Sequence, residues 1–181
     1  MEKTYIGIDP GSIGFITALF PNGEKEFYSI DENDDLALGR IIADIKKRSW
    51  EVVACMEQVH ALFNASAGST FAFGEIFGVL KGLLIANEIP YHLVPPKTWQ
   101  QEIWIHQDEI YVTKSRKQTD KVTGEVTQKS FKAVDPKPTS YNAARRIFPN
   151  VDLRKNERCK KYDDNKCDSL LIAEYARRKN L

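Results

Sequence analysis

The chain has 181 residues, of which 42% are hydrophobic and 28% are charged, and its formal net charge is +1. That length supports one full hydrophobic core and is short for two, and the composition is ordinary for a globular domain. Three cysteines without paired spacing argue against a disulfide framework or a zinc site, and no apolar run reaches membrane-spanning length. We expect a cytoplasmic protein without a membrane partner.

The opening residues predict an antiparallel meander of three strands, at 4–9, 13–20 and 24–30. The first strand ends at Asp9 and turns through "PGSIG". Glycines after a strand can cradle a phosphate, but the Lys-Ser/Thr pair of a phosphate loop is missing and a strand rather than a helix follows. We therefore favour a tight turn that leaves Asp9 at the strand end.

A helix and a fourth strand follow the meander. Apolar residues at helical spacing over 35–48 predict a helix, with Asp34 as its N-cap. The short apolar run 52–57 predicts a buried strand that ends at Glu57.

The next predicted element is a long helix that begins at Ser69 or Thr70 and ends near Asn87. Its glycines, Gly74, Gly78 and Gly82, recur every four residues on one face. Glycine destabilises a helix by up to about 1 kcal/mol relative to alanine, so three on one face suggest close packing against another backbone. That backbone belongs either to the sheet of the same chain or to a second copy.

The second half predicts a strand at 91–94, a helix beginning at "KTWQQEIW", and helices at 139–148 and about 164–179. Residues 106–138 differ, because they are polar and basic. Alternating Val and Thr there indicate an exposed hairpin around "TGEV", with a flexible arm as the alternative. The whole chain, 1–181, is predicted to be one α/β domain with 106–138 as an inserted basic arm.

Charge is unevenly distributed along the chain. Acidic residues gather in 24–44, whereas basic residues gather in the second half, including Lys114, Arg116, Lys117, Lys137, Arg145, Arg146 and Arg154. Such asymmetry is typical of a polyanion-binding surface, and an ordinary solvated surface is an equally good interpretation of any one cluster.

Three carboxylates stand where neighbouring elements end or turn: Asp9 after the first strand, Glu57 after the fourth, and Asp168 in the last helix, preceded by Asp163 and Asp164. Carboxylates at the ends of neighbouring strands point into one crevice and repel one another unless a cation neutralises them. Oxygen ligands suit Mg²⁺ or Mn²⁺, and two such ions can promote phosphodiester hydrolysis. Each acid alone is also explained as a turn former, a strand-end charge or a helix N-terminal acid.

An ordered set of motifs resembles RuvC-type Holliday junction resolvases, especially the shorter phage-type members. The motifs are "IGIDPGSIG", "CMEQVHALFNASAGSTFAFGEIFGVLKGLL", "VPPKTWQ", "AARRIFP" and "DDNKCDSLLIAEYARR". The resemblance covers most of the chain except 106–138. It implies an RNase H-like fold, with a five-stranded mixed sheet flanked by helices, in a homodimer that uses two Mg²⁺ or Mn²⁺ ions per active site, in a bacterial or phage-infected cell.

By this resemblance, Asp9, Glu57 and Asp168 match the family's catalytic, metal-binding acids. The family often places its remaining acid three residues before the last one, where this chain has Asn165. Residues at i−3 and i−4 share a helix face, so Asp164 is the preferred fourth ligand and Asp163 the second choice.

Further residues follow from the same resemblance. Lys97 resembles a lysine near the scissile phosphate, which would act as a point cation. Phe63, or His60 as an equally placed alternative, would stack at the junction centre. Phosphate contacts are expected from basic residues of the arm and of the later helix, namely Lys114, Arg116, Lys117, Arg145 and Arg146.

The expected function is a metal-dependent, structure-selective endonuclease that nicks Holliday junctions, and also forks or flaps, by two-metal-ion hydrolysis. The alternatives are a non-catalytic module that binds branched DNA and a related RNase H-fold nuclease that acts on RNA. An actin- or sugar-kinase-like ATPase, which shares a similar first turn, is disfavoured because this chain is too short for the two domains that such an enzyme needs.

Overall fold

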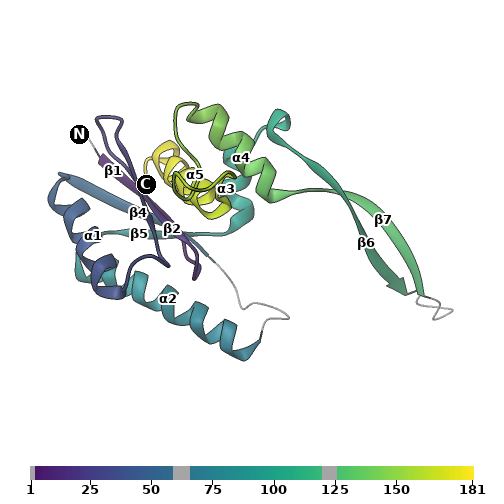
Figure 1. The fold of residues 1–181 in the computed structure, drawn as a ribbon, viewed down its shortest axis with the longest axis horizontal. Coiled ribbons are helices and arrows are strands. Elements are labelled where there is room, and N and C mark those ends of the chain that lie inside the picture. Colours follow the sequence, from purple (N-terminus) through teal and green to yellow (C-terminus); the bar gives the residue numbers. More distant parts are fainter. Residues whose placement is uncertain (1–2, 59–65, 120–125) are drawn as a thin grey trace.

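The computed structural model describes residues 3–58, 66–119 and 126–181. Five strands form one mixed sheet in the order β3-β2-β1-β4-β5 (Figure 1): β1 (Lys3–Asp9), β2 (Phe15–Leu19), β3 (Lys25–Ser29), β4 (Glu51–Glu57) and β5 (Tyr91–Val94). The first three strands are antiparallel, whereas β4 runs parallel to β1 and β5 parallel to β4. The predicted meander and the predicted five-stranded mixed sheet are both confirmed.

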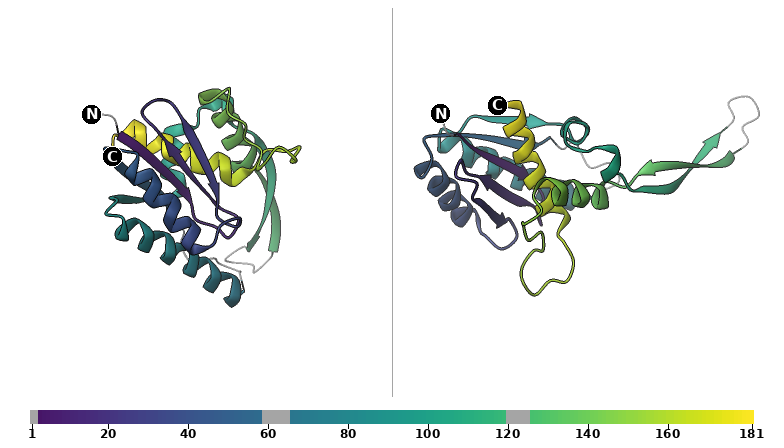
Figure 2. Two further views of the ribbon diagram at one scale, coloured as in Figure 1. Left: turned by 60° about the vertical axis from the view of Figure 1, so that its left-hand side comes forward. Right: turned by 90° about the horizontal axis from the view of Figure 1, so that it is seen from above.

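Helices cover both faces of this sheet (Figures 1 and 2). On one face, α1 (Asp35–Lys47) and α2 (Ala67–Ala86) contribute to one apolar core. On the other, α3 (Pro96–Ile103), α4 (Pro136–Ile147) and α5 (Asp164–Lys179) contribute to a second core. A 3-10 turn, η1 (His106–Asp108), follows α3.

The period-two alternation of the strands decides which residues meet which layer. In β1, Ile6 and Ile8 enter the core under α1 and α2, whereas Tyr5 enters the core under α5. Gly7 and Asp9 share the face of Tyr5. By the same parity in β4, Glu57 lies on the α5 side of the sheet together with Val53 and Cys55.

The contact between β1 and α5 is a close approach of two backbones. A Cβ atom placed on Gly7 would lie 2.1 Å from the carbonyl oxygen of Ser169 and 2.3 Å from the amide nitrogen of Ala173. Beside this contact, the buried hydroxyls of Thr17 and Ser169 are 2.7 Å apart. Only glycine allows α5 to lie this close to β1.

Two predicted helix starts are wrong, and one is confirmed. Asp34 caps α1 by accepting from the amide of Ala37 at 2.7 Å, as expected. The cap of α2 is Ser66, which accepts from the amide of Ser69, so this helix begins before the predicted Ser69 or Thr70. Helix α4 begins at Pro136 rather than 139, because proline is well suited to the first turn of a helix.

Helix α2 is the least covered element of the body. Its buried residues are Leu80 and Leu84, and a Cβ on any glycine of its stripe would have no described atom within 4 Å. Of the two alternatives for the stripe, packing against the sheet of the same chain is therefore not found among the described residues. By length and composition alone α2 is also able to cross a membrane, contrary to the expectation that the chain has no such segment.

The basic segment forms a two-stranded antiparallel arm. Strands β6 (Tyr111–Thr119) and β7 (Val126–Val134) pair at nine successive positions, and the arm extends away from the body (Figures 1 and 2). This confirms a hairpin rather than a flexible arm over the strands, while the predicted turn at "TGEV" lies partly outside the described residues.

The Gly7 contact generates a prediction about stability. Gly7→Ala should lower the free energy of unfolding by about 3 kcal/mol or more, because the backbone of α5 cannot yield to a new Cβ without leaving β1. Gly68→Ala is the control, since the nearest atom to its new Cβ, Ser66 Oγ, is 3.9 Å away. Thermal unfolding of both variants measures the difference, and equal melting temperatures would contradict the account.

Candidate functional site

Three carboxylates meet at one edge of the sheet. Asp9 and Glu57 end β1 and β4, which are paired in register through Ile8 and Met56. Asp168 immediately precedes Ser169, the residue of α5 whose carbonyl lies against Gly7. The acids are close enough for Asp168 and Glu57 to raise the pKa of Asp9. The structure therefore brings the three acids to the same edge of the sheet, and their role as metal ligands stays a prediction.

The turn after Asp9 is tight enough to require glycine. The amide of Gly11 donates to the carbonyl of Asp9 at 3.1 Å, and the amide of Gly14 donates to the carbonyl of Gly11 at 2.9 Å. A Cβ on Gly14 would lie 2.1 Å from the Asp9 carbonyl oxygen. The chain then enters β2, so the glycines fold the backbone back on itself and leave the Asp9 side chain at the sheet edge.

Burial is the main influence on all three acids. Desolvation raises the pKa of Asp9 well above its ordinary value, and the charges of Asp168, Glu57 and Asp163 raise it further. Burial also raises the pKa of Glu57, against the opposing effect of the Trp99 indole, which donates to Glu57 Oε1 at 2.8 Å. Burial raises the pKa of Asp168 to about 7. Such a cluster stores electrostatic repulsion that a bound cation would relieve.

Asp168 carries the clearest sign of a missing ligand. Its Oδ1 atom is buried without a hydrogen-bond partner among the described residues, and so is the nearby hydroxyl of Ser140, whose proximity lowers the pKa of Asp168. An orphaned buried carboxylate oxygen, within a set of oxygen donors only, suits a hard divalent cation. Within the described residues no three acid, His or Cys side chains are already close enough together to hold an ion. The acids would therefore have to close around it.

The three polar residues at the start of α5 have different partners. Asp163 caps the helix by accepting from the amide of Lys166 at 3.0 Å. Asp164 forms an ion pair with Lys137 at 2.6 Å, and its charge raises the pKa of Asp168 one turn later. Asn165 donates to the carbonyl of Ile13 at 3.0 Å and so ties α5 to the turn after Asp9. Asp164 shares the helix face of Asp168, as its spacing predicted.

Lys137 is a site residue that sequence reasoning missed. The sequence pattern places it only among the basic residues of the second half, yet it stands in the first turn of α4, where its ammonium forms an ion pair with Asp164. The charges of Asp164 and Asp168 raise the pKa of Lys137, so it remains protonated beside the acids. The signal available in the sequence was its position between Pro136 and Pro138, at a helix start that follows a strand.

The other predicted site residues are placed as follows. Lys97 is exposed in the first turn of α3, close in sequence to Val94, which pairs with Glu57. It makes no ion pair with the acids in the part of the chain that the structure describes. Phe63 and His60 lie outside the described residues, so the structure does not place them.

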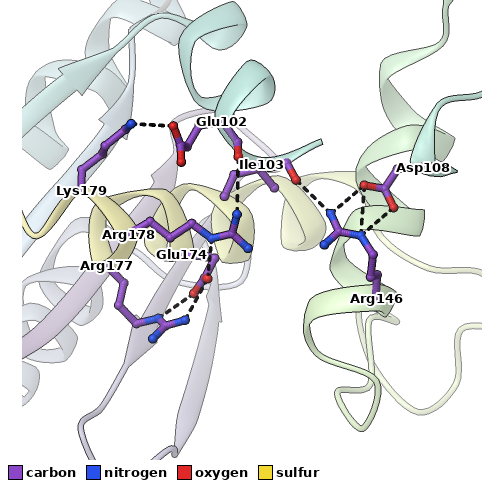
Figure 3. A network of polar contacts seen from close by, with 8 residues as sticks. All are labelled: Glu102, Ile103, Asp108, Arg146, Glu174, Arg177, Arg178 and Lys179. Carbon is purple, nitrogen blue, oxygen red and sulfur yellow. Dashed lines mark hydrogen bonds and ion pairs between the residues drawn. The ribbon is translucent and has the colours of Figure 1, made fainter. Parts of the chain in front are cut away.

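The two arginines of α4 differ in their surroundings. Arg145 is exposed and lines a surface pocket together with Arg154 and Lys160. Arg146 is also exposed, but its guanidinium is engaged by protein groups: it binds the buried carboxylate of Asp108 at 2.7 Å and the carbonyl of Ile103 at 2.9 Å (Figure 3). The geometry gives Arg146 a clear part in holding α4 and η1 together, which the sequence pattern did not indicate.

A second group of ion pairs holds the far end of α5. Glu174 is buried and accepts from Arg177 at 2.7 Å and from Arg178 at 2.9 Å (Figure 3). Lys179 pairs with Glu102 of α3. Glu174, Arg177 and Arg178 all belong to α5, so their ion pairs brace that helix internally. The pair between Lys179 and Glu102 is the one in this group that ties α5, which carries Asp168, to α3, which carries Trp99, the partner of Glu57.

Comparison with known proteins identifies the fold. No protein-family model and no curated protein matches the chain. Among solved structures, Thermus thermophilus RuvC in complex with a Holliday junction substrate aligns over 98% of this chain and 96% of its own, with a TM-score of 0.53 and 13% identity. A second Thermus thermophilus RuvC structure covers 97% and 96%, at a TM-score of 0.49 and 11% identity. The chain therefore has the RNase H-like fold of RuvC, as predicted.

The buried acids predict how stability depends on pH. Because burial raises the pKa of Asp168 to about 7, the folded protein binds more protons than the unfolded chain between its ordinary value of 3.8 and that value. In a chelator, wild-type stability should fall as pH rises through this window. The stability of Asp168→Asn should fall less across this window. Above the window its free energy of unfolding should exceed that of the wild type by about 1 kcal/mol or more, or roughly 2–4 °C in Tm.

Thermal unfolding of the two proteins at several pH values measures this difference. The interpretation would be wrong if Asp168→Asn were the less stable protein above the window, because the carboxylate would then contribute stability in its charged form.

Proposed function

We propose that this chain, which has the fold of the RuvC Holliday junction resolvases, is a metal-dependent endonuclease that nicks four-way junctions and other branched DNA. The observation that carries the proposal is the meeting of Asp9, Glu57 and Asp168 at one sheet edge, with Asp168 Oδ1 buried and unpartnered among the described residues. An acidic crevice without a cation is electrostatically unfavourable, and a nucleic acid phosphate approaches such a crevice only when cations are bound there.

The proposed cofactor is Mg²⁺ or Mn²⁺, two ions per site, which would activate a water molecule and stabilise the leaving oxygen of the phosphodiester. Asp9, Glu57 and Asp168 supply oxygen ligands, and the indole of Trp99 orients Glu57. The products are a 5′-phosphate and a 3′-hydroxyl, from in-line attack of the water.

Asp164 is the preferred fourth ligand, and its availability depends on Lys137. The ion pair between the two at 2.6 Å neutralises Asp164 in the absence of a bound ion. Asp164 would give up this ion pair as a metal ligand, and the Lys137 ammonium would then lie beside the crevice as a cation for a phosphate oxygen. Lys97, at the start of α3, is the second cation proposed for that role.

Branched DNA is the preferred substrate because of two features. One is the fold shared with a RuvC that was solved in complex with a Holliday junction substrate. The other is the basic arm, which extends away from the body that holds the acidic crevice (Figure 2). A straight duplex bound at the crevice would not pass along this arm, whereas a second duplex of a branched molecule would. The exposed cations proposed to contact phosphates are Lys114, Arg116, Lys117 and Arg145.

A second copy of this chain is the proposed occupant of the exposed face of α2. Phe71 and Ile85 are 75% and 61% exposed there, and the glycine stripe would let two helices approach closely. A four-way junction has approximate two-fold symmetry, so a dimer would place two acidic crevices for paired nicks. Glu75 and Lys81 put charges within α2, which favours a protein partner over a lipid bilayer.

A non-catalytic junction-binding module is the second candidate. It is favoured by Asn165, which occupies an often acidic position and is committed to the carbonyl of Ile13, and by the open arrangement of the acids. An RNase H-fold nuclease for RNA is the third candidate, and RNA substrates belong in the same assays.

The decisive variant for catalysis is Asp9→Asn. It removes one charge from the crevice and keeps the shape of the side chain, so the protein should fold and bind a four-way junction with unchanged affinity. Cleavage in Mg²⁺ should fall below detection, because Asp9 is the acid whose pKa both Glu57 and Asp168 raise, and its loss removes an oxygen ligand between them. Gel assays of binding and cleavage measure both effects, and cleavage at the wild-type rate would overturn the metal assignment.

The dimer is tested by Gly78→Leu. Nothing described lies within 4 Å of a Cβ at this position, so the variant should fold, but the larger side chain should prevent close helix pairing and give a monomer. Lys47→Leu, an exposed site on α1, is the control and should remain a dimer. Analytical ultracentrifugation distinguishes the states. A monomeric wild type, or sedimentation of the wild type with lipid vesicles, would contradict a second copy as the occupant.

A further inference from the structure

The two strands of the arm, over their described residues, carry cations without counter-charges; Asp120 and Glu125, which stand between the strands in the sequence, fall outside that range. These strands hold five basic residues and no carboxylate: Lys114, Arg116, Lys117, Lys129 and Lys132. All five are exposed, and none forms an ion pair within the residues that the structure describes. The body differs, because cations such as Arg146 and Lys155 are neutralised there by acids. The arm is therefore ready to accept an anion from outside the molecule.

The register of the two strands divides these cations between two faces. Directly opposed residues share a face, and faces alternate along each strand. Arg116 lies opposite Lys129, and Lys114 lies opposite Phe131. These four residues form what we call the arginine face. The opposite surface, which we call the lysine face, carries Lys117 and Lys132 at separate positions, opposite Gln128 and Thr113.

The arginine face has a chemistry that the lysine face lacks. The guanidinium of Arg116 lies over the ring of Phe131, 5.8 Å from its centroid, and Phe131 is 44% exposed. This contact limits the freedom of a planar cation beside an aromatic ring, which reduces the entropy lost on binding. On the lysine face, Gln128 donates to Ser115 at 2.9 Å, so polar groups there satisfy one another.

The dimensions of the arm match one groove of duplex DNA. Nine residues at about 3.4 Å each give a ribbon of roughly 30 Å, and its two strands are about 4.8 Å apart. A two-stranded ribbon with side chains enters the major groove, which is about 12 Å wide, whereas the minor groove is only about 6 Å wide.

The base of the arm is fixed rather than hinged. The amide of Asp135 donates to the carbonyl of Ile110 at 2.7 Å, and the amide of Ile110 donates to Thr139 Oγ1 of α4 at 3.1 Å. Next to them, the buried Asp108 is held by Arg146. An arm fixed in this way presents one face in a constant direction, so the direction of the bound duplex is also restricted.

We propose that the arginine face of the arm binds the major groove of a duplex arm of branched DNA, away from the duplex that lies at the acidic crevice. This rests on the proposed function, because it takes branched DNA as the substrate. Arg116 and Lys129 contact phosphates or base edges, and Phe131 contacts the apolar groups of the groove. Selectivity for branched DNA arises because the arm and the crevice engage two differently directed duplexes at once.

The test compares two matched double variants, each of which removes two arm cations. Arg116→Ala with Lys129→Ala alters the arginine face, and Lys117→Ala with Lys132→Ala alters the lysine face. Both double variants are made in the Asp9→Asn background, which should bind without cleaving, and affinity for a four-way junction is measured in Mg²⁺ by fluorescence anisotropy over a series of salt concentrations. The arginine-face variant should bind about tenfold or more weakly, and its salt dependence should fall by about two released ions. The fold-loss of junction affinity in the lysine-face variant should be less than half of the loss in the arginine-face variant.

The position of the contact is tested with arms of different length. With arms of about 20 base pairs, or two helical turns, Asp9→Asn alone should bind more tightly than the arginine-face variant. With arms of about 6 base pairs, roughly half a turn, the two should bind equally, because the arm then has no groove to reach. Phe131→Ala should weaken binding to the long-armed junction without changing the salt dependence.

The outcomes separate this inference from the proposed function. Equal losses in the two double variants, or an arginine-face variant that binds as tightly as Asp9→Asn alone, would overturn the arm inference even if the protein cleaves junctions. A wild type that binds junctions through the arginine face but never cleaves them would overturn the nuclease and leave the arm inference standing.

Discussion

The close approach of α5 to β1 at Gly7 is the constraint on which the site depends. With no side chain at this position, the carbonyl of Ser169 lies directly over the strand. The residue before Ser169 is Asp168, and two residues after Gly7 the strand ends at Asp9. One backbone contact therefore brings together two acids that are distant in sequence, and strand parity adds Glu57 from β4.

This arrangement of buried acids is unfavourable for the stability of the folded chain. Burial raises the pKa of each acid, and Asp168 keeps an oxygen without a partner among the described residues. The surrounding structure tolerates that strain because α5 is secured at both ends. Asn165 holds its first turn to the turn after Asp9. At its other end, Arg178 donates to the carbonyl of Glu102, and Lys179 pairs with the Glu102 carboxylate (Figure 3).

The first turn of α4 connects the arm to the acids. Thr139 Oγ1 accepts a hydrogen bond from the amide of Ile110 at the base of the arm, and the neighbouring Ser140 lies beside Asp168. In the same turn, Lys137 pairs with Asp164. If the arm binds DNA as proposed, one short turn connects it to both α5 acids. This provides a physical route by which substrate shape can influence the geometry of the crevice.

Sequence reasoning predicts the parts that depend on local pattern. Alternation and helical spacing give the strands, the helices and the arm, and strand ends give Asp9 and Glu57. It does not predict the partners that tertiary contact alone creates. Arg146 resembles a surface cation until Asp108 is seen beside it, and Lys137 resembles one until α5 brings Asp164 to it. The glycines of α2 indicate that another backbone packs closely against this helix. They do not indicate whether that backbone belongs to the same chain or to a second copy.

The most direct measurement is cleavage of a labelled four-way junction by the wild-type protein in Mg²⁺, beside a linear duplex, a single strand and an RNA–DNA hybrid of matched sequence. The account predicts paired nicks near the branch point, ending in 5′-phosphates, and little cleavage of the other three substrates. Binding of the junction without cleavage in Mg²⁺ or Mn²⁺, or equal cleavage of the junction and the linear duplex, would contradict it.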